Sequence, residues 1–186
     1  MDQRGLVERA RRGDHEAFAD LLDARLARLD AAARLILRDA ELARDAVQEA
    51  MIRAWRDLPG LRDPDRFDAW LRRLLANACL DLVRRRKRRV IEVELTPLDA
   101  PSAHDFAGGL ADREMLDEAL AGLPPGHRAV VALHYLLGMP LSEVAASLGI
   151  PHGTAKSRLH YALAAMRIAV TVEAEPSAAT VAGGLT

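Results

Sequence analysis

The chain has 186 residues, half of them apolar, and a formal net charge of −1. This length suffices for one medium or two small hydrophobic cores. Cys79 is the only cysteine, which excludes an intramolecular disulfide and a four-cysteine zinc site. The first residues carry no apolar signal segment and no run is long enough to span a bilayer, so we expect a cytoplasmic protein without membrane insertion.

The near-zero net charge hides two segments of opposite sign. Residues 71–89 contain eight basic residues and one acid, and residues 90–118 contain eight acids and one arginine. The first segment predicts a basic patch suited to a polyanion. The second is an acidic strip.

Three amphipathic helices are predicted in the first half of the chain. Asp14 is the expected N-cap of a long helix that ends near Asp39, and a second helix follows and stops at Leu58-Pro59-Gly60. After a short loop, a third helix runs from about residue 65 to 88. The expected buried positions are Phe18, Leu22, Leu29, Ala33 and Ile36; then Ala43, Val47, Ala50, Met51, Ala54 and Trp55; then Phe67, Leu71, Leu74, Leu75, Ala78 and Leu82. Three such helices predict a compact bundle.

Two features of this bundle allow two interpretations each. Trp55, Phe67 and Trp70 are either core residues or base-stacking platforms, and the apolar stripes favour the core for the first two. Asn77 is either an ordinary exposed residue or an amide that contacts a base edge.

Six consecutive cations, residues 84–89, end the third predicted helix. A helix C-terminus attracts two or three cations through its dipole, but six repel one another unless a polyanion is bound.

Proline, glycine and acids mark residues 90–111 as a linker. Only residues 90–95 alternate like a strand, so the expected fold class is all-α. A helix over about 112–121, a break at 123–126 and a helix over about 127–137 follow. The last residues, 171–186, predict a frayed tail.

The segment 141–167 predicts a helix-turn-helix. Ser142 is the expected cap of its first helix, and Gly149 is expected to end that helix. Val144, Ala145 and Leu148 form the apolar stripe of the first helix, Ile150 fills the corner, and Ala155, Leu159, Ala162 and Met166 form the stripe of the second. Lys156, Ser157, His160 and Tyr161 lie on the opposite face, where a recognition helix meets base edges. An ordinary helical hairpin with a solvated polar face is the alternative.

The sequence contains none of the common motifs of an enzyme active site. It contains no glycine-rich phosphate loop, no nucleophile elbow and no histidine or cysteine cluster at metal-ligand spacing. We therefore expect no catalytic residues, no metal and no cofactor.

Four segments in this order resemble the extracytoplasmic-function (ECF) class of bacterial RNA polymerase sigma factors. They are RGDHEAFADLL, RDAVQEAMIRAW, FDAWLRRLLANACLDLVRRRKRR and LAGLPPGHRAVVALHYLLGMPLSEVAASLGIPHGTAKSRL. The resemblance covers about residues 8–89 and 112–168. It implies two small helical domains, region 2 at 1–89 and region 4 at 112–170. An acidic flexible linker at 90–111 joins them, and a disordered tail follows at 171–186.

The resemblance also implies a non-catalytic specificity subunit that binds core RNA polymerase and directs it to promoter DNA. Region 2 would bind the clamp of the largest subunit, and region 4 the flap of the second-largest. An anti-sigma factor is a further implied partner, and the bound protein would be nucleoid-associated. The implied clamp-binding residues are Asp45, Gln48, Glu49, Arg53 and Trp55.

Two DNA contacts follow from the same resemblance. The minus-ten element is assigned to Leu61, Arg62, Arg72, Arg73, Asn77, Arg84, Arg85, Arg86, Lys87 and Arg88. The minus-thirty-five element is assigned to Thr154, Lys156, Ser157, Arg158, His160 and Tyr161. The sequence departs from the family pattern at Tyr161, where arginine is common, and at Leu61, where an aromatic residue is often found.

Two other function classes compete with this interpretation. A helix-turn-helix regulator of the response-regulator type predicts a phosphoacceptor or ligand domain at the N-terminus, which a bundle ending in RRRKRR disfavours. A protein that binds polymerase but no promoter is disfavoured by the basic run and by Lys156. The acidic segment is either a soluble tether, a segment that threads the RNA-exit path, or a shield for the basic helix.

Overall fold

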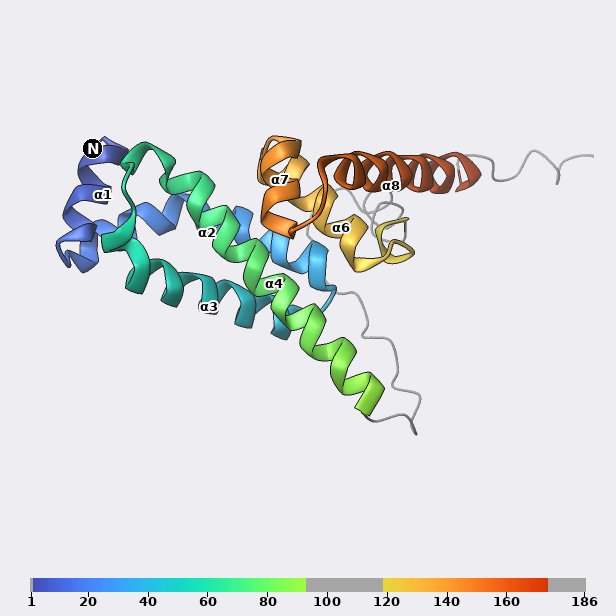
Figure 1. Ribbon diagram of the computed structural model, residues 1–186, viewed down its shortest axis with the longest axis horizontal. Helices are drawn as coiled ribbons and strands as arrows, with labels where there is room; N and C mark the ends of the chain where they lie inside the picture. The colour runs from blue at the N-terminus through green and yellow to red at the C-terminus, as the bar shows by residue number, and fades with distance from the viewer. Residues whose placement is uncertain (1, 93–118, 174–186) are drawn as a thin grey trace, which may run out of the picture.

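A computed structural model describes residues 2–92 and 119–173, and Figure 1 shows its helices. All regular elements in these two ranges are helical, which agrees with the predicted all-α class. The elements are α1 (Gln3–Arg11), α2 (His15–Leu37), α3 (Ala40–Asp57), η1 (Leu58–Gly60), η2 (Pro64–Arg66), α4 (Phe67–Glu92), α6 (Pro125–Val131), η3 (Ala132–Leu136), α7 (Leu141–Leu148) and α8 (His152–Glu173). None of these helices is long and apolar enough to cross a membrane.

Aspartates begin the two helices that follow α1. The Asp14 carboxylate accepts a hydrogen bond from the backbone N–H of Ala17 at 3.0 Å, which confirms it as the N-cap of α2. Asp39 accepts from the N–H groups of Glu41 and Leu42 and so caps α3. Between them, Arg38 adopts the left-handed conformation (φ 51°) that lets the chain leave α2 and enter α3 at once.

The bundle core follows most of the predicted stripes. Phe18, Leu74 and Leu82 were predicted as buried and are half-buried against the core, and the largest departure is in α3. Its fully buried positions are all alanine: Ala43, Ala46, Ala50 and Ala54. Val47, Met51 and Trp55 are only half-buried at the edges of this stripe. Small side chains let α3 lie close to both α2 and α4, which are its two main neighbours.

The helix α4 extends further than predicted. It continues to Glu92, so residues 90–92 are helical and the strand-like alternation at 90–95 is a wrong indication over these three residues. A strand needs a partner for its backbone groups, whereas a continuing helix pairs its own. Figure 1 shows the C-terminal end of α4 extending beyond the neighbouring helices.

Residues 93–111 of the predicted linker lie outside the described residues, as do most of the helix expected at 112–121 and most of the tail. The tail prediction is wrong for residues 171–173, which belong to α8. The helix expected from about His127 begins earlier, at Pro125, because proline suits the first turn of a helix. Its last turn, η3, is π-helical.

The helix-turn-helix is present. Gly149 ends α7 with φ 63°, and Val144, Ala145 and Leu148 are buried, as predicted. The prediction that Ser142 caps α7 is wrong, because α7 begins at Leu141, one residue before Ser142, and Ser142 lies exposed within its first turn. Instead the backbone carbonyl of Pro140 accepts hydrogen bonds from the N–H groups of Glu143 and Val144.

The two predicted domains share one hydrophobic core. The first unit (α1–α4) and the second unit (α6–α8) meet where α2 contacts α6 and η3, and where α4 contacts α7 (Figure 1). The second unit contributes buried side chains to the core of the first: Ala129, Val130, Ala132, Leu133, Leu137, Met139, Val144 and Leu148. The units are therefore packed face to face in this structure.

Candidate nucleic-acid interface

The N-terminal half of α8 presents a polar face. Lys156, Ser157, His160 and Tyr161 are exposed, while Ala155 and Ala162 on the opposite side are fully buried. This burial pattern fixes the rotation of α8 about its axis. The four side chains predicted to contact base edges therefore lie on the solvent-exposed face of the helix.

Two α8 side chains, Arg158 and Tyr161, lie against the start of α6. The half-buried Arg158 packs so closely on Gly126 that a Cβ there would lie 2.9 Å from its Nη1 atom. The Tyr161 ring meets the His127 ring edge-on, with centroids 5.0 Å apart, although 58% of Tyr161 is exposed. Burial, and then the charge of Arg158, lower the pKa of His127. Arg158 and Tyr161 are therefore oriented by α6, while Lys156 and His160 extend freely.

A second polar surface follows α4. Arg73, Arg84, Arg85 and Arg86 are exposed, Asn77 is half-buried, and the side chains of Lys87 and Arg88 lie outside the described residues. The pairings of these cations are long: Arg84 lies 3.7 Å from Asp81, and Arg86 lies 3.9 Å from Asp39. Exposed pairs of this kind leave most of the positive potential unneutralised.

The structure separates Leu61 from this surface. Leu61 is 9% exposed and belongs to the core of the first unit, whereas Arg62 beside it is exposed. Asp63 then accepts a hydrogen bond from the N–H of Asp65 at the start of η2. A buried leucine cannot stack on an extruded base, so in this loop Arg62, and not Leu61, presents its side chain to solvent.

The residues assigned to polymerase divide between two sides of α3. Asp45, Glu49 and Arg53 line a groove against α4, where Arg53 pairs with Glu49 at 2.6 Å and with Asp81 at 3.5 Å. Gln48 is exposed beside them. Trp55 instead stacks on His15, with ring centroids 4.3 Å apart, and contacts Phe18. The structure brings the three charged residues together and places Trp55 against α2.

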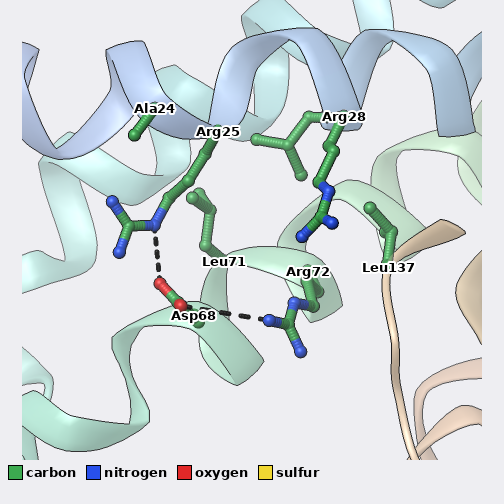
Figure 2. Close-up of a pocket in the computed structure, with 8 residues that line it drawn as sticks. Ala24, Arg25, Arg28, Asp68, Leu71, Arg72 and Leu137 are labelled. Atoms are coloured by element: carbon green, nitrogen blue, oxygen red, sulfur yellow. Dashed lines mark hydrogen bonds and ion pairs between the residues drawn. The ribbon is translucent and has the colours of Figure 1, made fainter.

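Two groups of residues escaped the sequence analysis. One is the pair Arg25 and Arg28 of α2, which line the pocket drawn in Figure 2 together with Arg72, a residue that the sequence did indicate. The other is Arg128, which is 8% exposed and hydrogen-bonds across the two units. The sequence signal for the first group was that Arg25 and Arg28 lie outside the apolar stripe of α2. The described residues contain no histidine, cysteine or carboxylate cluster able to hold a metal ion.

Comparison with known families decides what these two polar surfaces are. The family model "Sigma-70 region 2" matches residues 11–89, and "Sigma-70, region 4" matches residues 113–166. The chain is also 37% identical over 133 residues to the ECF RNA polymerase sigma factor SigL of Mycobacterium tuberculosis, covering 70% of this chain and 75% of SigL. The chain belongs to the ECF sigma factors. Its helix-turn-helix is therefore region 4, and its N-terminal bundle is region 2, not the phosphoacceptor domain of a response regulator.

Further members of the family match over more of the chain. The RNA polymerase sigma-E factor of Streptomyces avermitilis is 36% identical and covers 83% of this chain and 86% of its own length. Among solved structures, the sigma factor RpoE in complex with the anti-sigma factor NepR from Bartonella quintana matches with a TM-score of 0.71 at 26% identity, over 84% of this chain and 98% of that chain. CnrH in complex with the cytosolic domain of CnrY matches with a TM-score of 0.63 at 28% identity, over 94% and 99%.

Regions 2 and 4 of a sigma factor recognise the minus-ten and minus-thirty-five promoter elements. This ECF sigma factor therefore binds core RNA polymerase and directs promoter-specific transcription initiation. It is a specificity subunit, as the sequence predicted.

Proposed function

We propose that region 4 of this sigma factor contacts the minus-thirty-five element through Lys156, Ser157, His160 and Tyr161. The observation that carries the proposal is the rotation of α8, which buries Ala155 and Ala162 and exposes these four side chains. Thr154 and Arg158 are half-buried beside them, and we assign to them the adjacent phosphates. A good bidentate base contact is worth about 1–3 kcal/mol of discrimination.

In region 2, α4 holds the melted minus-ten element. Arg72, Arg73, Arg84, Arg85, Arg86, Lys87 and Arg88 supply positive charge for its phosphates, and Asn77 supplies an amide for a base. The loop before α4 contributes Arg62, with Leu61 fixing the loop from the core side. Extruding a base costs a few kcal/mol, so these contacts must form only with melted DNA.

Core polymerase binds the side of α3 that borders the groove with α4. Asp45, Gln48, Glu49 and Arg53 present mixed charge to the clamp, and Trp55 supports the helix from the α2 side. Region 4 meets the flap. As in its sigma factor relatives, the chain is a non-catalytic subunit, and it acts in the cytoplasm, nucleoid-associated when bound to polymerase.

An anti-sigma factor inhibits this sigma factor. The support is the likeness to RpoE bound to NepR and to CnrH bound to CnrY. Both of those complexes match nearly the full length of the sigma chain, so the surfaces that bind their partners have counterparts here.

Promoter binding requires the closed arrangement to open. The centres of the two promoter elements lie about 25 base pairs, or about 85 Å, apart along the duplex. Two small domains that share one core cannot reach so far, since a small domain is about 30 Å across. The 26 residues between Glu92 and Ala119 can span at most about 90 Å when extended, which suffices.

Transcription with purified core polymerase and a library of genomic promoters tests the function. Lys156→Ala with Ser157→Ala should lower initiation about tenfold or more at promoters that need the upstream element and leave polymerase binding intact. The matched control is Arg12→Ala, an exposed cation directly after α1 and outside every proposed contact. Absence of any promoter-specific transcript at low salt would refute the proposal.

The role of Asn77 needs its own measurement. Asn77→Ala should slow promoter opening while leaving closed-complex formation unchanged, because its amide contacts only an extruded base. Equal losses in the two steps would remove Asn77 from the minus-ten site.

A further inference from the structure

A pocket of about 200 Å³ lies between α2 and α4, outside every contact assigned so far except that of Arg72. Its walls are Ala24, Arg25, Arg28 and Leu29 of α2, Asp68, Leu71 and Arg72 of α4, and Leu137, which follows η3. Three guanidinium groups therefore face one carboxylate, as Figure 2 shows. The formal charge of the pocket is +2.

Arg25 is committed to holding the structure together. Its Nε donates to Asp68 at 2.6 Å and its Nη2 donates to Gln3 at 2.7 Å. The guanidinium also lies 5.4 Å from the centroid of the Phe67 ring. Arg25 therefore fixes Asp68, the acid of the pocket, and neutralises its charge.

Arg28 and Arg72 are left without such compensation. Arg28 is exposed and forms no hydrogen bond or ion pair with any described residue, and the contact of Arg72 with Asp68 is long, at 3.9 Å. In Figure 2 Arg28 extends from α2 toward Arg72, whose guanidinium is turned toward Asp68, and both side chains line the pocket. Two like charges directed into one pocket repel, and an anion between them converts this repulsion into two charge-assisted hydrogen bonds.

The remaining walls indicate what kind of anion fits. Leu29, Leu71 and Leu137 form an apolar side next to the guanidinium groups. A phosphate attached to a sugar or base satisfies both, because guanidinium groups bind phosphate in a planar fork while the carbon atoms cover the leucines. A free metal cation is excluded by the positive charge.

We propose that this pocket binds the phosphate of a nucleotide, with Arg28 and Arg72 as its two ligands. The phosphate has two possible sources, the backbone of a single DNA strand or a free nucleotide. The strand source rests on the proposed function, since Arg73 and Asn77 follow Arg72 on α4. In the open arrangement that promoter binding requires, Leu137 leaves the pocket, whereas Arg28 and Arg72 both remain in region 2. The free-nucleotide source does not depend on it.

Binding of two probes to the full chain tests the proposal: a short labelled oligothymidine, and inorganic pyrophosphate. Arg28→Gln and Arg72→Gln should each weaken binding of one probe about fivefold or more. The double variant should weaken it by less than the product of the single effects, because both arginines hold the same phosphate. The matched control is Arg12→Gln, which removes an exposed positive charge elsewhere.

The two arms distinguish the sources. Loss confined to oligothymidine, with the dependence of log K on log salt falling by about 0.7 per arginine, assigns the pocket to a DNA strand. Loss of pyrophosphate binding assigns it to a free nucleotide. Variants that match Arg12→Gln in both arms overturn the proposal.

Two controls keep a structural role of Arg28 apart from a ligand role. Because Arg28 faces a like charge, Arg28→Gln should not lower the melting temperature, and Arg28→Lys should keep part of the affinity, since it retains the charge but not the planar fork. A melting temperature lowered together with unrescued binding would count against the pocket. If wild-type protein supports promoter-specific transcription while the pocket variants bind like the control, only the pocket proposal fails.

Discussion

The Arg128 guanidinium of region 4 donates a hydrogen bond to the backbone carbonyl of Ile36 in region 2, with an Nε···O distance of 3.2 Å. The acceptor belongs to the last turn of α2, where helical carbonyls lack intrahelical partners. Arg128 also donates to the carbonyl of Leu123. Burial, and then the charge of Arg38, lower the pKa of Arg128 to about 10, so it is charged at neutral pH and its desolvation must be offset by these bonds.

Arg128→Met should therefore favour the open arrangement of the two regions. Loss of hydrogen bonds from a charged donor removes about 1.5–3 kcal/mol, which is a shift of tenfold or more in the closed-to-open ratio. Energy transfer between dyes on cysteines introduced at the exposed positions 62 and 152 measures the separation.

Arg128→Lys is the matched control for that experiment. It keeps the charge but not the fork that bonds two carbonyls, so its transfer efficiency should fall between those of wild type and Arg128→Met. Unchanged transfer in Arg128→Met, with helicity retained by circular dichroism, would show that the apolar contacts alone hold the regions together.

The sequence predicted the elements of this fold better than the contacts between them. Asp14 and Gly149 are local signals whose effect depends on a few neighbouring residues, and both act as predicted. The apolar stripe on the helix of Leu133 shows that this residue is buried, but it does not show against which unit. The shared core was for this reason not predicted.

Site residues were harder to place for the same reason. Trp55 follows the polar residues of α3 at helical spacing, yet its ring is held by His15, forty residues away. Leu61 occupies a loop position that suits base capture, but its apolar side chain gains more from burial. Arg128 resembles any surface arginine in the sequence, since no local pattern marks a buried donor to a distant carbonyl.

Paired glycine substitutions in the helix-turn-helix should change stability in opposite directions. Gly149→Ala places a Cβ at φ 63° and should lower the free energy of unfolding by about 1–2 kcal/mol. Gly153→Ala, in the first turn of α8 with nothing within 4 Å of the new Cβ, should raise it by up to about 1 kcal/mol. Urea unfolding followed by circular dichroism measures both. Equal effects would mean that the turn relaxes away from the left-handed conformation.

Region 4 should lose stability as the pH falls below the ordinary pKa of histidine. Burial and Arg158 lower the pKa of His127, so the unfolded chain takes up a proton at a higher pH than the folded one. Stability is then complete above about pH 6.5 and declines from there toward the folded pKa.

Difference measurements isolate the contribution of His127 from the other titrating groups. In urea unfolding between pH 7 and pH 5, His127→Gln should show a smaller decline than wild type, and so should Arg158→Gln, which removes the repelling charge. A decline as steep in both variants as in wild type would assign the pH dependence to other residues.

The thiol of Cys79 should react only when the bundle opens. Cys79 is fully buried in the core of α4, and burial raises its thiol pKa to about 12. At pH 8 about one molecule in ten thousand would carry the reactive thiolate even if reagent could reach it. Maleimide or a disulfide reagent should therefore label native protein slowly and urea-unfolded protein at once.

A cysteine introduced at the exposed position 62 should be labelled at once in both states and is the control. Rapid labelling of native Cys79 would show that α4 separates from α2 and α3 far more often than its closed core implies, and would also forbid selective dye attachment in the opening experiment.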